Sequence, residues 1–89
     1  MPIISMFYGI IIKIFFFDNK QHKTPHIHAE YQDENAAIEI ETGKILAGSL
    51  KPKQLKLVQA WIEIHREALE ADWKLAINSE EVFKIDPLK

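Results

Sequence analysis

Two very apolar runs open the chain. Residues 3–8 and 10–17 are rich in isoleucine and phenylalanine, and Gly9 stands between them. β-Branched and aromatic residues favour extended backbone, so we expect two short strands with a bend or bulge at Gly9. The second run would place large side chains on both faces of its strand. This predicts that a helix covers one face and a partner chain covers the other.

A polar segment, residues 18–25, follows the apolar runs and contains turn-forming residues. Pro25 favours an extended conformation of the residue before it and should close the loop. Lys20, His22 and Lys23 give the loop cationic and titratable groups. We therefore expect these three residues to contact a partner or a phosphate group.

Short alternating segments occupy the middle of the chain. Residues 26–31 and 36–41 alternate apolar with polar positions around the polar residues 32–35, which predicts a β-hairpin. Residues 45–50 should form a further strand after a turn that contains Gly43. The apolar residues 82–85, which precede Asp86 and Pro87, are expected to add an edge strand.

From Pro52 onward the apolar period changes to that of a helix, and proline suits the first helical turn. The pattern predicts either one amphipathic helix to about Asn78, with a kink near residues 67–70, or two helices with a break. Trp61 and Trp73 should lie in the core, where an indole N–H needs an acceptor. The apolar or aromatic positions of the helix are Leu55, Val58, Trp61, Ile62, Leu69, Trp73 and Ala76.

The whole pattern predicts an α+β fold in which a small, mostly antiparallel sheet of about four to five strands packs on a C-terminal helical segment. The 89 residues should form a single domain, 1–89, because so short a chain cannot build a second core. The expected contacts between sheet and helix involve Ile27, Tyr31, Ile38, Ile40, Leu55, Val58, Ile62 and Leu69.

Composition narrows the class of protein. The chain has no cysteine, so it has neither a disulfide framework nor a thiolate metal site, and we expect a cytoplasmic location. The formal net charge of −2 creates no general attraction to nucleic acid or anionic membranes. The apolar N-terminal run is interrupted by Gly9 and Lys13 and is shorter than the ~20 residues that span a bilayer, so no membrane association is expected.

The candidate chemistry is concentrated in residues 26–30. Side chains two apart on a strand share a face, so His26, His28 and Glu30 should project to one side of the hairpin, away from the helix. Ala37, Glu39 and Glu41 should share that face from the neighbouring strand. The outer face would then hold two imidazoles and several carboxylates.

This arrangement leaves three interpretations open. His26, His28 and Glu30 offer the nitrogen and oxygen donors that zinc or another divalent metal accepts. Alternatively, the histidines act as general base and general acid in phosphodiester transfer, with Lys20 or Lys23 stabilising phosphate charge. In the third interpretation the imidazoles are structural: they pack on the outer face, bond to Glu39 or Glu41 and support an oligomer interface.

Several separate segments form an ordered pattern along nearly the whole chain: Pro2, Ile4, Ser5 and residues 7–9, then Pro25, His26, His28, Glu30 and Tyr31, then residues 40–43, then residues 65–67, Trp73, Ile85, Pro87 and Leu88. This pattern resembles the bacterial domain of unknown function family numbered 4160. The chain departs from the family pattern at Thr24, where the family shows a second proline, and in a longer and more basic loop at residues 20–23.

The resemblance implies that His26 and His28 are motif residues and that the protein belongs to a compact two-gene locus of the toxin–antitoxin kind. The first functional hypothesis is therefore an interaction component of such a module, which forms a homo-oligomer or binds a protein encoded by the adjacent gene. Nucleic acid is a further candidate partner. The competing hypothesis is a histidine-dependent ribonuclease or metal-dependent hydrolase with His26, His28 and Glu30 at its centre.

Overall fold

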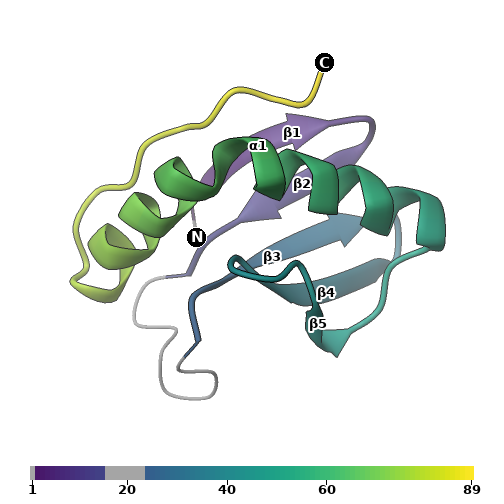
Figure 1. The fold of residues 1–89 in the computed structure, drawn as a ribbon, viewed down its shortest axis with the longest axis horizontal. Helices are drawn as coiled ribbons and strands as arrows, with labels where there is room; N and C mark the ends of the chain where they lie inside the picture. Colours follow the sequence, from purple (N-terminus) through teal and green to yellow (C-terminus); the bar gives the residue numbers. More distant parts are fainter. Residues whose placement is uncertain (1, 16–23) are drawn as a thin grey trace.

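The computed structural model describes residues 2–15 and 24–89, and in these ranges the chain forms one antiparallel sheet covered on one face by one helix (Figure 1). The five strands lie in the sheet in their order along the chain, so each strand pairs with its sequence neighbours. The predicted α+β class is confirmed. The elements are β1 (Ile3–Phe7), β2 (Ile10–Lys13), β3 (His26–Tyr31), β4 (Glu34–Glu39), β5 (Ile45–Gly48) and α1 (Pro52–Ile77).

The first hairpin has a tight two-residue turn at the place where a bend or bulge was predicted. Phe7 and Ile10 are paired, and Tyr8 and Gly9 between them have φ values of 50° and 77°. Two successive positive φ values are the signature of a type I′ turn, whose twist suits antiparallel strands. The turn thus joins the two apolar runs directly.

The second hairpin is tighter than the sequence suggested. Tyr31 pairs with Glu34, so only Gln32 and Asp33 form the turn, and Gln32 has a φ of 55°. Consequently β4 begins at Glu34 rather than at residue 36, and it ends at Glu39. The central pairing of Ile27 with Ile38 is the predicted register.

The core lies between the sheet and α1. Ile12, Ala29 and Ile27 share the helix-facing side of the central strands and are fully buried. Each isoleucine buried in this way stabilises the fold by about 1.5–3 kcal/mol. The residues predicted to join sheet and helix all belong to this core, with Tyr31 and Leu55 half-buried at its border.

Helix α1 begins with Pro52 in its first turn, as predicted, and it has a kink. The kink lies at His65, whose φ and ψ are −112° and 22°, and not at residues 67–70. Two tertiary contacts lie at this point. The His65 ring is 5.6 Å from the ring of Trp61, and the Nε of Arg66 donates to the carbonyl of Ile40 at 3.2 Å. The bend follows these contacts, which the apolar period does not encode.

The helix ends in a Schellman motif. The N–H of Glu80 donates to Leu75 O at 2.8 Å, and the N–H of Ser79 donates to Ala76 O at 3.1 Å. Ser79 takes the left-handed conformation, with a φ of 56°, that this motif needs and that glycine usually supplies. The chain reverses here, so that residues 80–89, which we call the strap, run back along the molecule.

The strap lies beside β1 and is not a strand, which corrects the prediction for residues 82–85 (Figure 1). One backbone hydrogen bond joins the two segments, from the N–H of Ile85 to Ile4 O at 2.8 Å. Pro87 has no N–H to extend the ladder. Val82, Ile85 and Leu88 contact the core at a spacing of three residues, whereas a strand would alternate.

Among the described residues, no helix is long and apolar enough to cross a membrane.

Candidate functional site

The two motif histidines lie on β3, the central strand of the sheet. His26 is paired with Glu39 of β4, and His28 is paired with Lys13 of β2 and Ala37 of β4. The cross-strand neighbours are those that the alternation predicted for Ala37 and Glu39. The environments of the two imidazoles nevertheless differ strongly.

His26 is fully buried and reaches the helix. Its ring centroid lies 4.9 Å from that of Trp73 in α1 and 5.1 Å from that of His28. The prediction that both histidines lie on the face away from the helix is therefore wrong for His26. Because His26 is the first residue of β3, its ring lies at the end of the sheet, where alternation no longer separates the two faces.

A hydrogen bond defines the tautomer of His26. Its Nδ1 lies 2.8 Å from the carbonyl oxygen of Thr24, an atom that can only accept. Nδ1 therefore carries the proton, and in the neutral ring Nε2 has the lone pair. The same bond fixes the residues that lead into β3, so His26 connects the strand entry, the sheet and α1.

His28 is half-buried on the outer face of the sheet. Its ring contacts the Phe15 ring edge-on, at a centroid distance of 4.1 Å and an interplanar angle of 70°. The cross-strand neighbour Lys13 adds a cationic side chain to the same face. Of the two histidines, His28 is thus the one that a partner or substrate can reach.

Glu30 turns toward a lysine rather than forming a three-donor group with the histidines. Its Oε2 lies 2.9 Å from the Nζ of Lys13, and both side chains are partly exposed. In the described ranges, 2–15 and 24–89, no three histidine, aspartate or glutamate side chains lie close enough to hold a metal ion. The donor set His26, His28 and Glu30 therefore does not fit zinc in this arrangement.

Lys20, His22 and Lys23, the residues predicted to contact a partner or phosphate, lie outside the described residues.

The outer sheet face is the surface on which His28 lies, opposite α1. Cross-strand pairing places Met6 beside Ile11, Ile11 beside Glu30, and Lys13 beside Ile3 and His28. Ile3 and Met6 are exposed and Ile11 is half-buried, so apolar and charged groups are mixed here. We define the outer sheet face by Ile3, Met6, Ile11, Lys13, His28, Glu30 and Ala37.

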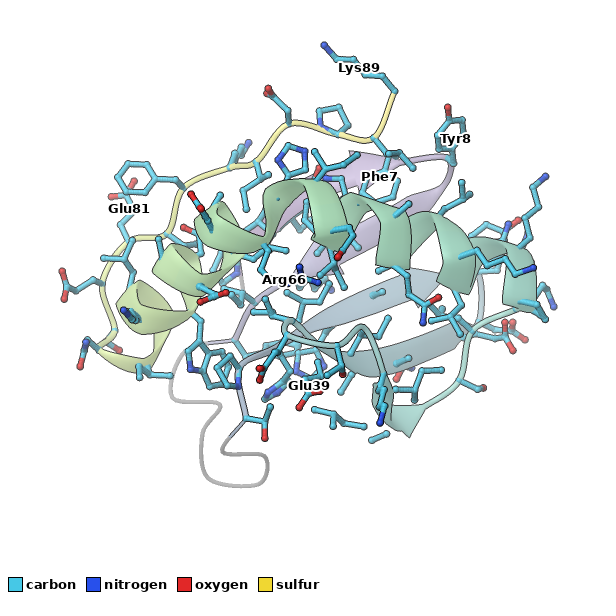
Figure 2. The ribbon with its side chains drawn as sticks, in the orientation of Figure 1. Phe7, Tyr8, Glu39, Arg66, Glu81 and Lys89 are labelled. Carbon is cyan, nitrogen blue, oxygen red and sulfur yellow. The ribbon has the colours of Figure 1, made fainter. Side chains whose placement is uncertain are left out.

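Arg66 and Glu39 mark the border between α1 and the end of β4 (Figure 2). Both terminal nitrogens of Arg66 donate to the Glu63 carboxylate, at 3.1 and 2.7 Å. This guanidinium lowers the pKa of Glu63 below its ordinary value. Glu39 accepts a hydrogen bond from the Thr42 hydroxyl. The Nε of Arg66 donates to the carbonyl of Ile40, just after β4, at 3.2 Å, so Arg66 joins the kinked part of α1 to the end of the sheet, a role that the sequence did not reveal.

Asp72 is a second residue that the sequence analysis missed. Its side chain is only 2% exposed, and its Oδ1 accepts the N–H of Phe83 in the strap at 2.9 Å. Oδ2 is buried without a hydrogen-bond partner, and burial raises the pKa of the carboxyl group. A signal was present in the sequence, because Asp72 is three residues after Leu69 and four before Ala76, on the apolar stripe.

The structure and site define a small α+β protein with one half-exposed histidine on an otherwise mixed sheet face. Residues 9–74 match the family described as Domain of unknown function (DUF4160), and the chain belongs to that family. The matched stretch includes both histidines and Arg66 and ends before the strap. No curated protein and no solved structure shows significant similarity to the chain.

Proposed function

We propose that the protein is an interaction component of a toxin–antitoxin-like module and that it binds the protein encoded by the adjacent gene through the outer sheet face. The observation that supports this proposal is the exposed apolar surface at Ile3 and Met6, next to the half-buried Ile11 and His28. Apolar groups beside polar ones on a flat surface are typical of protein interfaces.

The charges of the outer sheet face fit a protein partner better than nucleic acid. Lys13 is paired with Glu30 at 2.9 Å, so the centre of the face has no excess positive charge. Nucleic-acid affinity depends mainly on neutralising phosphates with lysine and arginine. A protein partner can match both members of the ion pair, with His28 beside them as a donor or acceptor.

Co-purification tests the proposal. The tagged protein is expressed together with the product of the adjacent gene, and the amount of retained partner is measured. Met6→Asp should reduce retention at least about tenfold, because it buries a charge in the interface. Ile64→Asp is the matched control, because Ile64 and Met6 are similarly exposed, at 66% and 61%, and Ile64 lies on the helix.

Two results would contradict this proposal. One is a wild-type protein that remains monomeric in size-exclusion chromatography and does not retain the neighbouring product. The other is equal loss of retention in Met6→Asp and Ile64→Asp. Self-association without the neighbouring product would instead indicate that the same face forms a homo-oligomer, which a shift to monomer in Met6→Asp would identify.

A histidine-dependent ribonuclease is the second candidate function, and the neighbourhood of His28 and Lys13 favours it. An imidazole can transfer a proton to or from the reacting hydroxyl, while an ammonium group stabilises phosphate charge. His26, being fully buried, would act only by positioning His28. Growth arrest on expression and cleavage of RNA in vitro, both abolished by His28→Ala with the fold intact, would select this candidate.

A further inference from the structure

We propose that the outer edge of β1 is a strand-addition site, where an extended segment of a partner protein pairs with residues 4–6 and displaces the strap. This inference deepens the proposed function and rests on it for the existence of a protein partner. The edge adjoins the outer sheet face, because Met6 belongs to both. An added strand would extend the sheet and continue that face.

The backbone of β1 presents hydrogen-bonding groups away from β2. In a two-residue hairpin the closing pair, here Phe7 and Ile10, exchanges hydrogen bonds, and the next pair, Met6 and Ile11, does not. The N–H and C=O of Met6 therefore point to the outer edge. Ile4 lies where the register shifts between Ile3 and Ser5, and its carbonyl faces the strap.

The strap pairs with this edge at one end only. It runs in the same direction as β1 (Figure 1). A parallel ladder that starts with the bond from Ile85 N–H to Ile4 O would continue with Met6 N–H donating to Ile85 O, a bond that the strap does not form, and then with residue 87 donating to Met6 O. Residue 87 is proline, which has no N–H to donate. The strap therefore leaves the ladder incomplete at Met6.

The β1 edge and the strap together line two hollows. One, of about 340 Å³, is lined by residues 3–6 and by residues 84–87, and the other, of about 630 Å³, includes Pro2, Ser79 and Val82. Ile3, Ile4 and Lys84 line both. Because four consecutive β1 residues and four strap residues line the first hollow, it follows the edge of the strand.

The strap runs from Glu81 near its start to Lys89 at its far end (Figure 2), and hydrogen bonds in its middle part hold it to the molecule. Phe83 N–H donates to Asp72, and the Asp86 carbonyl accepts the indole N–H of Trp61 at 2.8 Å. Ile85 is buried between these contacts. A competing strand would have to replace the ladder bond, these two hydrogen bonds and the packing of Val82, Ile85 and Leu88 on the core.

The chemistry of the edge specifies its occupant. The backbone groups of Ile4 and Met6 require an extended segment, which supplies donors and acceptors at alternate residues. The hollows beside Ile3 and Ile4 favour apolar side chains at every second position. Lys84 borders both hollows, but Asp86 lines one of them and Glu81 lines the other, so the edge has no excess charge that would select a charged flank. The partner segment should therefore be an extended β-strand with apolar side chains at alternate positions.

A synthetic peptide of about eight residues that alternates valine and threonine is the direct probe. Added to the isotope-labelled protein, it should shift the amide resonances of Met6 and Ile85 and slow hydrogen exchange at Met6. A peptide of the same sequence, N-methylated at the residues that face β1, should have no effect. Equal binding of the methylated peptide, or shifts confined to other strands, would overturn the proposal.

Paired variants locate the site on the protein. Met6→Pro removes the edge-facing N–H, which an edge strand tolerates, whereas Met6→Ala removes only the side chain. The peptide should bind Met6→Pro at least about tenfold more weakly than Met6→Ala, the loss expected for one backbone bond and its neighbours. Asp72→Ala, which releases Phe83, should increase peptide affinity several-fold because the strap competes less well.

The product of the adjacent gene separates the two proposals. If it binds Met6→Pro and Met6→Ala equally well, strand addition is wrong while the proposed function stands. If it does not bind the wild-type protein but the peptide does, the proposed function is wrong and the strand-addition site stands. Equal peptide binding to the two Met6 variants, together with an intact sheet by circular dichroism, would reject the site.

Discussion

The imidazole of His26 packs on the indole of Trp73, with the ring centroids 4.9 Å apart and the planes at 51°. This contact joins the first residue of the central strand to the C-terminal half of α1. Since Nδ1 of His26 also contacts the Thr24 carbonyl at 2.8 Å, one buried side chain connects three parts of the chain. His26 therefore has a structural role, and His28 is the accessible histidine of the motif.

The two histidines should consequently respond differently to substitution. His26→Ala should lower the free energy of unfolding by about 2–4 kcal/mol, because it opens a cavity against Trp73 and leaves the Thr24 carbonyl without its donor. His28→Ala, at a half-buried position, should cost about 1 kcal/mol or less. Urea unfolding followed by tryptophan fluorescence measures both values. Equal losses would contradict the distinction between the histidines.

The hydrogen bond from Trp61 to Asp86 should determine how firmly the strap is held. Trp61→Phe keeps an aromatic ring in the core but removes the indole N–H that donates to Asp86 O at 2.8 Å. We expect faster hydrogen exchange at the Ile85 amide and a loss of about 1 kcal/mol in stability. Trp73→Phe is the control, because it changes an indole that packs on His26 instead. Unchanged exchange at Ile85 in Trp61→Phe would show that other contacts hold the strap.

Much of the sheet could be predicted from the sequence because its elements are local. The alternation in β3 and β4 predicted that Ile27 faces Ile38, and the helical period predicted the buried Val58 and Ile62. A meander in which every strand pairs with its neighbour needs no long-range information. The family motif also identified the strand on which the candidate site lies.

The features that the sequence did not predict depend on distant contacts. Alternation assigns a residue to a face only inside a sheet, so it failed for His26 at the strand end, where Trp73 comes from α1. The kink at His65 follows contacts with Trp61 and with the carbonyl of Ile40. The strap lies along β1 but does not pair as a strand, because Pro87 follows its single ladder bond.

Asp72 predicts a specific dependence of stability on pH. Burial raises its pKa above the ordinary value of 3.8, and the Phe83 N–H opposes part of that effect. The folded protein therefore keeps this proton at a pH where the unfolded chain has lost it. The contribution of Asp72 to stability is fully present below pH 3.8 and is lost as the pH rises through the raised pKa.

Asp72→Asn should remove that dependence while keeping an acceptor for Phe83. Relative to wild type, the variant should become progressively more stable as the pH is raised from about 4 to about 7, in urea unfolding at each pH. Asp72→Ala lacks the acceptor and should be less stable than Asp72→Asn throughout. A constant difference between wild type and Asp72→Asn across the range would mean that Asp72 does not titrate as its burial requires.

Gly48, at the end of β5, should tolerate substitution much less well than Gly9. Both have positive φ values, 78° and 77°, which cost an alanine about 1–2 kcal/mol. A Cβ on Gly48 would in addition lie 2.2 Å from the backbone oxygen of Asn35, whereas on Gly9 its nearest neighbour would be the Tyr31 ring at 3.4 Å. Gly48→Ala must therefore separate β5 from β4, and Gly9→Ala need not change any pairing. Thermal unfolding should show a clearly larger loss of stability for Gly48→Ala than for Gly9→Ala. Hydrogen exchange in Gly48→Ala should become faster at the amides of Ala36 and Ser49. Equal losses of stability in the two variants would contradict the close approach of β5 to β4.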